Sequence, residues 1–441
     1  MNTEASSIVQ TSAIARQRLG LDFLAVRSAS AALAAPLSAE DCVVQTMPDV
    51  SPTKWHLAHT SWFFEQFVLG PHSPGTYSPL HAGYADLFNS YYESVGPQFP
   101  RPKRGFLTRP SLAEVLDYRS EITALVGDLI ATCDESVLRA IAPLISLGIH
   151  HEQQHQELIL TDIKHVLAAN PMMPIYRPAE VVQEDAAECA WVSFEEGLFA
   201  AGADLAQPDL SSRFTFDNEG PRHRVFLEPF ELATRPITNG EFAEFIEDGG
   251  YRRHEFWLAM GWDLAKRRSW DAPLYWFPTK GSAQGWDQFT LHGPRRVNPN
   301  EAVCHLSYFE ADAYARWAGA RLPTEFEWER AVQSEVPPTV VPAENESDLH
   351  PAAARLVPAS CFQQLTGAVW QWTSSSYAPY PGYQPAAGAV GEYNGKFMCN
   401  QYVLRGSSCV TPKGHARPTY RNFFPPEIRW QFSGLRLARR I

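Results

Sequence analysis

The chain has 441 residues, of which 45% are hydrophobic and 20% are charged, and its formal net charge is −12 at pH 7. A chain of this length normally divides into two domains, each large enough to fold without disulfide staples. The negative charge disfavours nucleic acids, which bind to basic surfaces, and no run of about 18 apolar residues is present to cross a membrane. We therefore expect small-molecule partners, with no nucleic acid and no membrane involved.

The N-terminus and the cysteines bear on the cellular compartment. The first 20 residues have no apolar stretch behind a basic start, so no secretory signal is predicted and we expect a cytoplasmic protein. The cysteines are odd in number and never follow a C-x-x-C spacing; they stand at positions 42, 133, 189, 304, 361, 399 and 409. This distribution argues against a disulfide framework and against a cysteine zinc site.

The first part of the chain has a helical pattern. Long helices are predicted from composition and apolar spacing over residues 12–34, 53–69, 111–133 and 136–168. Four long helices within about 170 residues predict a bundle. The connection between the second and third helices, from about 70 to 110, is rich in Gly, Pro, Tyr and Arg, and long connections of this kind are often functional.

The pattern changes after the fourth helix. Residues 171–190 are predicted to be a linker, because prolines interrupt the chain there and the helical periodicity is lost. From residue 191 to 441, short apolar runs are separated by Gly, Pro, Asp and Asn, and helical patterns occur at 239–250 and 307–320. This second part is therefore predicted to be a mixed α+β domain of short strands and many loops.

The fourth predicted helix carries HHEQQHQE at residues 150–157, which contains the pattern H-E-x-x-H. His151 and His155 are four positions apart on the apolar face of this helix, so both point inward. Two inward imidazoles at this spacing can chelate one metal ion. A pair of buried, hydrogen-bonded histidines without a metal would give the same pattern.

A catalytic metal site needs a third ligand. His56 and His59 on the second helix are candidates, because metal sites in bundles are built from facing helices. His165 would lie about 15 Å along the helix from His155, which is too far to share one ion. Three histidines suit zinc, copper or iron about equally. The motif also leaves open a zinc metalloprotease with Glu152 as its general base.

Several motifs together resemble the sulfoxide synthases of ergothioneine biosynthesis, a family of non-heme iron hercynine oxygenases. The resemblance runs from about residue 50 to 440 and rests on SPTKWHLAHTSWFFE, FNSYYESVG, RPKRGFLTRP, HHEQQHQELILTDIKH, RLPTEFEWERA, VWQWTSSSY, GEYNGKFM, VLRGSSC and TYRNFFPPEIRWQFSGLRLAR. It implies an Fe(II) enzyme that uses O2 to join the imidazole of hercynine to the sulfur of cysteine or γ-glutamylcysteine, with a sulfoxide as product. A close relative that joins hercynine to a selenosugar, a selenoneine synthase, fits the same motifs.

The resemblance also implies the fold of both parts. Residues 1–170 are expected to form a DinB-like four-helix bundle that carries the metal site. Residues 191–441 are expected to form a C-type-lectin-like domain of the formylglycine-generating-enzyme type that closes the substrate pocket. Formylglycine-generating enzymes work through paired cysteines, but Cys399 and Cys409 stand here in sulfoxide-synthase motifs, so we expect them to be structural. A non-catalytic binding module is the third alternative, since such folds also serve as ligand-binding scaffolds.

By similarity, the iron ligands are His59, His151 and His155. Gln154, between the two ligands on the fourth helix, is expected to hydrogen-bond the imidazole of hercynine. This assignment leaves Glu152 without a role as a base, because the reaction splits no water.

The resemblance assigns the proton donor to a tyrosine, since a phenol can supply the proton that O2 chemistry needs. Tyr91 and Tyr92, in the connection between the second and third helices, are the favoured pair. Tyr377 and Tyr380 from the second domain are the alternative.

Two further groups of residues are expected to bind the substrates. Arg101 and Arg104 are assigned to the carboxylate of the thiol substrate, a group that guanidinium ions bind well. Asn422, Phe423 and Phe424 are assigned to the trimethylammonium group of hercynine, because aromatic faces attract quaternary ammonium ions. Some relatives carry Trp-Asp where this chain has Phe-Phe, so the identity of the thiol stays open.

Overall fold

The computed structural model describes residues 2–73, 75, 77–179, 185–205, 214–281, 285–334, 349–354 and 362–441, with side chains from residue 13 onward. The chain divides into two compact units. Unit 1 comprises Met1–Val166, Leu205–Phe216 and Pro385–Tyr393, and unit 2 comprises Leu167–Asp204, Asp217–Gln384 and Asn394–Ile441. Unit 1 therefore combines the N-terminal helices with a segment from late in the sequence, residues 385–393.

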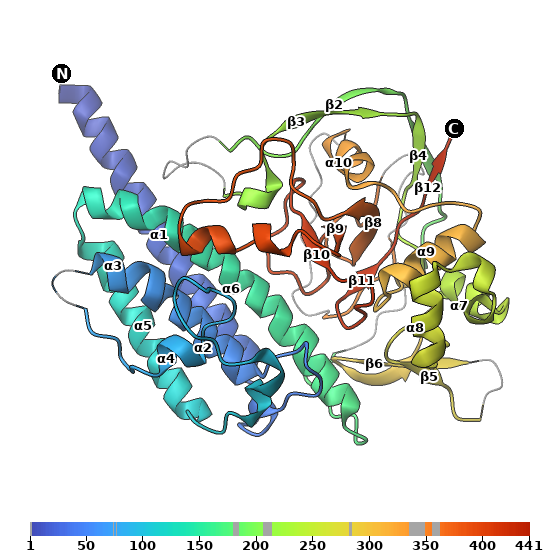
Figure 1. Cartoon of the computed structure of the whole chain (residues 1–441), viewed down its shortest axis with the longest axis horizontal. Coiled ribbons are helices and arrows are strands. Elements are labelled where there is room, and N and C mark those ends of the chain that lie inside the picture. The colour runs from blue at the N-terminus through green and yellow to red at the C-terminus, as the bar shows by residue number, and fades with distance from the viewer. Residues whose placement is uncertain are drawn as a thin grey trace. The chain divides into compact units, whose positions relative to one another are not determined.

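Unit 1 is built on four long helices, as predicted. In Figure 1 they run side by side: α1 (Asn2–Ala34), α2 (Thr53–Phe64), α5 (Leu112–Thr132) and α6 (Glu135–Ala169). A capping box begins α5, where the Ser111 hydroxyl accepts from the backbone N–H of Glu114 and the Glu114 carboxylate accepts from the backbone N–H of Ser111. All twelve residues of α2 are buried, including its two histidines, so their polar atoms need partners inside the bundle.

The long connection after α2 is ordered against the bundle. α2 continues into a π-helical turn, η2 (Glu65–Leu69), and α3 (Gly70–His72); α4 (Tyr84–Leu87) and the 3-10 helix η3 (Arg101–Phe106) follow. The buried Glu65 carboxylate accepts from the hydroxyl groups of Tyr77 and Tyr118 at 2.8 and 2.6 Å. Since π-turns are frequent beside functional sites, this end of α2 is a place to look for one.

Unit 2 contains short strands and short helices, which confirms the predicted α+β class. One sheet has the order β1 (Trp191–Phe194), β4 (Phe230–Ala233), β12 (Ala438–Arg440), and another has the order β10 (Asn422–Phe424), β9 (Tyr402–Gly406), β8 (Trp370–Ser376), β11 (Ser433–Gly434). A hairpin pairs β2 (Gly197–Ala201) with β3 (His223–Leu227), and a third sheet has the order β5 (Trp276–Pro278), β6 (Trp286–Thr290), β7 (Gly293–Arg296). Neighbouring strands are antiparallel except for the parallel pair β8 and β11.

In the described part of unit 2, four helices accompany these strands: α7 (Asn239–Glu247), α8 (Ala259–Arg267), α9 (Tyr308–Trp317) and α10 (Glu325–Ser334). α7 and α9 fall within the predicted helical patterns, whereas α8 and α10 were not predicted. The remaining 3-10 turns are η1 (Asp41–Val43), η4 (Asp217–Glu219), η5 (Gly250–Arg252), η6 (His254–Phe256), η7 (Ala389–Glu392) and η8 (Gly395–Phe397). Within the predicted linker, residues 171–179 and 185–190 contain no helix or strand, and residues 180–184 lie outside the described residues.

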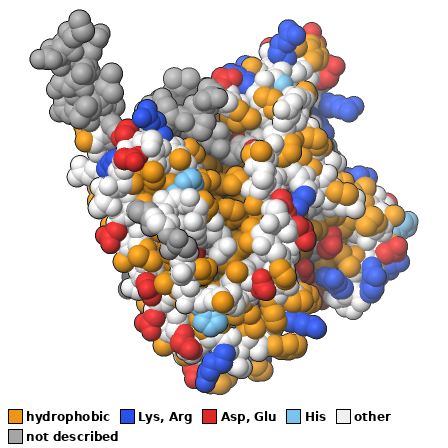
Figure 2. Space-filling view, turned by 60° about the vertical axis from the view of Figure 1, so that its left-hand side comes forward, with side chains coloured by type: hydrophobic (Ala, Val, Ile, Leu, Met, Phe, Trp, Pro, Cys, Tyr) orange, Lys and Arg blue, Asp and Glu red, His pale blue; other side chains and the backbone are white. Residues whose placement is uncertain are grey.

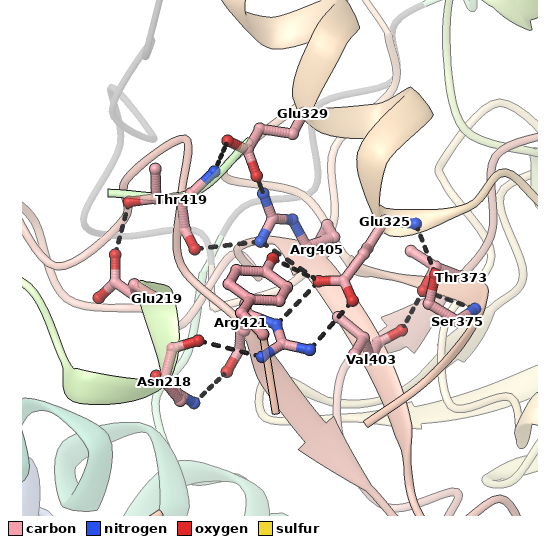
Figure 3. A network of polar contacts seen from close by, with 12 residues as sticks. Asn218, Glu219, Glu325, Glu329, Thr373, Ser375, Val403, Arg405, Thr419 and Arg421 are labelled. Carbon is pink, nitrogen blue, oxygen red and sulfur yellow. Dashed lines mark hydrogen bonds and ion pairs between the residues drawn. The ribbon is translucent and has the colours of Figure 1, made fainter. Parts of the chain in front are cut away.

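Buried ion pairs connect α10 to β9 and to the residue that precedes β10 (Figure 3). Glu325 accepts from the guanidinium of Arg421 at 2.8 and 3.0 Å and from the hydroxyl of Tyr380 at 2.9 Å. Glu329, one turn later, accepts from Arg405 on β9 at 2.6 Å. Because a buried charge is costly unless it is paired, these contacts fix α10 against the sheet and give Tyr380 a structural partner.

Among the described residues, none of the helices combines the length and the apolar character that a membrane span requires. On the face drawn in Figure 2, acidic and basic side chains lie interspersed among neutral and hydrophobic ones. Among the described residues no two cysteines form a disulfide, and Cys361 lies outside the described residues. Cys399 is exposed and Cys409 is half-buried.

Candidate metal centre

Three histidines of unit 1 converge on one point. His59 of α2 and His151 and His155 of α6 each offer a ring nitrogen, and these nitrogens lie within 4.8 Å of one another. Nε2 of His59 is 3.2 Å from Nε2 of His151. Two nitrogens at this distance can both bind one ion at a metal–nitrogen distance of about 2.1 Å. The structure thus brings together the three residues that the sequence resemblance named as ligands.

The three imidazoles are in the protonation state that metal binding needs. Burial lowers the pKa of His151 to about 3. Burial, followed by the neighbouring His151, lowers the pKa of His59 and of His155 well below the usual value. All three rings are therefore neutral at pH 7, and a neutral imidazole is the form that coordinates a metal. A buried group of three neutral histidines without a carboxylate fits a divalent transition-metal ion.

The orientation of His59 is set by groups around it. Its Nδ1 lies 2.6 Å from the backbone oxygen of Phe88, and because a carbonyl can only accept, Nδ1 carries the hydrogen and Nε2 is left as the ligand atom. The ring is stacked between the indoles of Trp55 and Trp62, at centroid distances of 4.6 and 5.3 Å. The neighbouring candidate, His56, stands outside the group of three, and its Nδ1 is 2.8 Å from Nδ1 of His155.

Glu152 lies in a separate, fully buried cluster of charges. Its carboxylate accepts hydrogen bonds from Arg27 at 2.9 Å, from Ser30 at 2.6 Å and from Arg119. Burial raises the pKa of Glu152, but Arg119 and Arg27 lower it by more, so the net pKa is below the usual value. Both carboxylate oxygens are therefore engaged in structural contacts with α1 and α5. This arrangement argues against a metalloprotease, whose general base must reach the proton of a water.

A tyrosine from late in the sequence lies at the group of three histidines. Tyr393 ends the 385–393 segment; its hydroxyl donates to Oε1 of Gln154, and its ring centroid is 5.6 Å from that of His151. Because Oε1 of Gln154 accepts from Tyr393, the amide N–H groups are the part of Gln154 that can donate to a ligand. Sequence reasoning missed Tyr393, although it stands in the quoted motif GEYNGKFM; no local pattern indicates that this segment returns to the helices.

The predicted tyrosine pair, Tyr91 and Tyr92, lies next to Tyr393. The rings of Tyr91 and Tyr92 are stacked with centroids 4.6 Å apart, their hydroxyl oxygens are 3.4 Å apart, and the centroid of Tyr91 is 6.3 Å from that of Tyr393. Tyr92 is fully buried, and burial, followed by the neighbouring Tyr91, raises its pKa well above the usual value. Tyr91 is half-buried. Tyr91 therefore stands between the buried Tyr92 and Tyr393.

The alternative tyrosines, Tyr377 and Tyr380, belong to unit 2. Tyr377 accepts from the amide of Asn218 at 2.9 Å, and its ring is stacked on that of Phe423 at 4.0 Å. Tyr380 donates to Glu325 within the ion-pair network described above. Both hydroxyl groups thus have structural partners inside unit 2.

The two predicted arginines differ in burial. Arg101 is exposed, whereas Arg104 is only 2% exposed, although both are on η3. The guanidinium of Arg104 donates to the hydroxyls of Ser51 and Ser90 at 2.9 and 3.2 Å and lies 3.3 Å from the ring centre of Trp55. Burial, followed by the neighbouring Arg101, lowers the pKa of Arg104, although the charge of Asp162 acts in the opposite direction, and among the described residues no carboxylate lies at ion-pair distance from its guanidinium. A buried cation of this kind is suited to bind an anionic group.

Asn422, Phe423 and Phe424 form β10 in unit 2, and all three are half-buried. The side-chain oxygen of Asn422 accepts from the backbone N–H of Phe423 at 2.9 Å. Phe423 is stacked on Tyr377, and the ring of Phe424 lies 6.4 Å from that of Trp430. These residues offer the edge of an aromatic surface.

Comparisons with known proteins agree with this architecture. Residues 22–159 match the DinB superfamily, and residues 178–348 and 358–441 match the sulfatase-modifying factor enzyme 1-like domain. Both matches confirm the predicted fold class.

Relatives align over nearly the whole chain. The hercynine oxygenase of Mycobacterium tuberculosis is 31% identical over 418 residues, which cover 89% of this chain and 91% of that protein. The hercynine oxygenase of Mycolicibacterium thermoresistibile is 31% identical over 417 residues, covering 89% and 88%. Ergothioneine biosynthesis protein 1 of Schizosaccharomyces pombe is 27% identical over 260 residues, covering 54% of this chain and 30% of that protein. With this extent of similarity along both of its parts, the chain belongs to the hercynine oxygenase family of enzymes.

Proposed function

We propose that this chain is an iron(II)-dependent enzyme that uses O2 to join the imidazole carbon of hercynine to the sulfur of cysteine or γ-glutamylcysteine, giving a sulfoxide in ergothioneine biosynthesis. The buried group of three neutral histidines, with Gln154 and Tyr393 beside it, carries this proposal. Membership of the hercynine oxygenase family supports hercynine as one substrate.

The metal ligands in this proposal are His59, His151 and His155. Fe(II) bound there would supply the redox chemistry that O2 requires. The imidazoles alone suit several metals, so the choice of iron rests on the family resemblance. The protein's own contribution is a dry, neutral ligand set, because burial keeps the three rings unprotonated and excludes bulk water.

Gln154 and Tyr393 are proposed to bind the hercynine imidazole. The Tyr393 hydroxyl donates to Oε1 of Gln154 and thereby holds the amide in one orientation. In that orientation an N–H of Gln154 is the donor that an unprotonated ring nitrogen of hercynine can accept from. Tyr91 and Tyr92 are proposed to supply the proton for the reaction, with Tyr91 delivering it from the side of Tyr393.

Charged groups of the substrates have candidate partners as well. Arg104, with Arg101 nearby on the same 3-10 helix, is proposed to bind the carboxylate of the thiol; a substrate carboxylate would give the buried guanidinium the charged partner it needs. Asn422, Phe423 and Phe424 are proposed to bind the trimethylammonium group, to which aromatic faces are attracted.

Oxygen uptake by the Fe(II)-loaded full-length chain tests the proposal. Hercynine would be combined with cysteine, with γ-glutamylcysteine or with a selenosugar, and each compound would also be given alone, with products identified by mass. We expect uptake that requires both substrates and a hercynyl-cysteine or γ-glutamyl-hercynyl-cysteine sulfoxide as product. The metal-free and Zn(II)-loaded proteins are the controls and should consume no O2.

Activity with the selenosugar but with neither thiol would replace the proposal by a selenoneine synthase. No metal-dependent turnover with any pair of substrates would leave a non-catalytic binding protein and would contradict the proposal.

A further inference from the structure

A series of side-chain hydrogen bonds extends from His155, one of the three histidines, to His56 and Asp162. Nδ1 of His155 is 2.8 Å from Nδ1 of His56, and Nε2 of His56 is 3.1 Å from Oδ2 of Asp162. The same Asp162 oxygen accepts from the backbone N–H of Ser51 at 2.8 Å, just before α2 begins. His56, Asp162 and Ser51 are all buried. The beginning of α2 and the later part of α6 thus form a buried polar connection behind one ligand.

The direction of these hydrogen bonds can be derived from Asp162, the last side chain in this series of contacts. An ionised carboxylate only accepts, so the His56 nitrogen that faces Asp162 should carry the hydrogen. Nδ1 of a neutral His56 is then an acceptor, and Nδ1 of His155 must be the donor. A neutral His155 ring has one N–H hydrogen, and this hydrogen is then on Nδ1. Nε2 of His155 therefore has a free lone pair that can bind a metal ion.

The reverse direction is electrostatically unfavourable. If His56 donated to His155, the His155 hydrogen would have to sit on Nε2, where it would block metal binding. Nε2 of His56 would then be an acceptor facing a carboxylate oxygen at 3.1 Å, and two acceptors at hydrogen-bond distance repel each other. The geometry therefore favours the one arrangement that prepares His155 as a ligand.

We propose that His56 and Asp162 are positioning residues of the metal centre, which hold His155 in the tautomer and orientation whose Nε2 binds the ion. The inference rests on the three-histidine metal site of the proposed function. Outer-shell partners of this kind commonly change metal affinity about 10- to 100-fold when they are removed. The ligands differ in this respect: a backbone carbonyl orients His59, and Nδ1 of His151 has no hydrogen-bond partner within the described chain.

Metal binding by variants of the full-length protein tests the role of His56. His56→Leu removes the acceptor for His155, whereas His56→Asn keeps a side-chain oxygen close to the position of Nδ1. His165→Leu is the matched control, because His165, on α6, also makes a side-chain hydrogen bond, 2.6 Å to the hydroxyl of Thr46, but does not contact the ligands through it. The probe is Co(II), with its affinity measured by chelator competition and its site by visible absorption.

We expect His56→Leu to weaken Co(II) binding about 10- to 100-fold and to alter the absorption bands, with His56→Asn and His165→Leu within about threefold of the wild type. Thermal melting of the metal-free proteins measures any loss of stability. His56→Leu and His165→Leu should both lose stability, whereas only His56→Leu should lose affinity for Co(II). If His56→Leu does not fold, Asp162→Ala, which retains both histidines, should weaken Co(II) about tenfold.

Two results would overturn the inference while the metal site stands: unchanged Co(II) affinity in both His56→Leu and Asp162→Ala, or His56→Asn binding as weakly as His56→Leu. Failure of the wild-type protein itself to bind Co(II) would be a different result, because it would remove the three-histidine site and the proposed function together.

Discussion

Glu152 shows at the scale of one residue how a motif can mislead. It occupies the position of the general base in H-E-x-x-H, yet its carboxylate is paired with two buried arginines. Glu152→Gln should leave Arg27 and Arg119 without a counter-charge and lower the free energy of unfolding by about 3–5 kcal/mol. Urea unfolding of the metal-free protein measures this loss, and folded Glu152→Gln should still bind metal through its histidines.

The matched control for this change is Glu231→Gln. Glu231 also pairs with an arginine, Arg439, but this ion pair is at the surface, so the substitution should change stability little. A Glu152→Gln protein that is as stable as the wild type but has lost all turnover would contradict the structural role and return Glu152 to the position of a base.

Tyr393 carries the second prediction at this scale. Tyr393→Phe removes the hydroxyl that fixes the amide of Gln154, so the KM for hercynine should rise about tenfold, which corresponds to the loss of one hydrogen bond. Tyr91→Phe should instead lower kcat, because it removes the proposed proton donor. Steady-state kinetics with hercynine as the varied substrate distinguish these effects.

Tyr383→Phe is the control for Tyr393→Phe, because Tyr383 also donates to a single oxygen, that of Asp217 at 2.9 Å, but within unit 2. If Tyr393→Phe lowers kcat with an unchanged KM, Tyr393 is the proton donor and the roles of the tyrosines must be exchanged.

At the scale of elements, the 385–393 segment is joined to the loop that carries the tyrosine pair. The carboxylate of Glu392, at the end of η7, accepts from the backbone N–H groups of Glu93 and Ser94, both at 3.0 Å, and from the Ser94 hydroxyl at 2.6 Å. Glu392 directly precedes Tyr393 in the sequence, so its side chain joins the segment that carries Tyr393 to the loop that carries Tyr91 and Tyr92.

Glu392→Ala should therefore loosen two elements at once. We expect faster hydrogen exchange at the amides of Glu93 and Ser94, because both lose their acceptor, together with a higher KM for hercynine. Glu93→Ala, which removes only the exposed contact to Gln98, serves as the control and should leave both properties unchanged. Unaltered exchange in Glu392→Ala would mean that the segment is held mainly by its ring contacts.

The helices show how much of the secondary structure could be predicted from the sequence. The helical periodicity predicted α2, α5 and α6 to within a residue or two, with the end of α2 continuing as a π-turn, because apolar spacing is a local property. α10 was missed: three of its ten residues, Glu325, Glu327 and Glu329, are carboxylates that are buried, so no simple apolar stripe marks the helix.

The site was predicted only in part, for a related reason. The i, i+4 histidines are visible in one helix, but the choice between His56 and His59 depends on Asp162 and Phe88, which belong to other elements. Tyr393 was missed because its segment is 239 residues away from Gln154 in sequence. Contacts at such separations are set by tertiary packing, and no single-sequence pattern encodes them.

For the molecule as a whole, the buried histidines make stability depend on pH. In the folded, metal-free protein the pKa values of His59, His151 and His155 are lowered, to about 3 for His151, whereas an unfolded histidine titrates near 6.5. Below about pH 6.5 the unfolded state thus binds more protons than the folded state. The free energy of unfolding should therefore fall with falling pH, by up to about 1.4 kcal/mol per pH unit for each histidine.

Urea unfolding of the metal-free protein at pH 7.5, 6.5 and 5.5 measures this dependence. His151→Asn removes one of the three titrating groups, so its unfolding free energy should depend less steeply on pH than that of the wild type. Bound metal should make the free energy of unfolding depend less on pH over this pH range, because only the folded state offers the assembled site. This protection should end at the pH at which protons displace the ion. Equal slopes for the wild type and His151→Asn would show that His151 is protonated in the folded protein, and a protonated ring could not serve as a ligand.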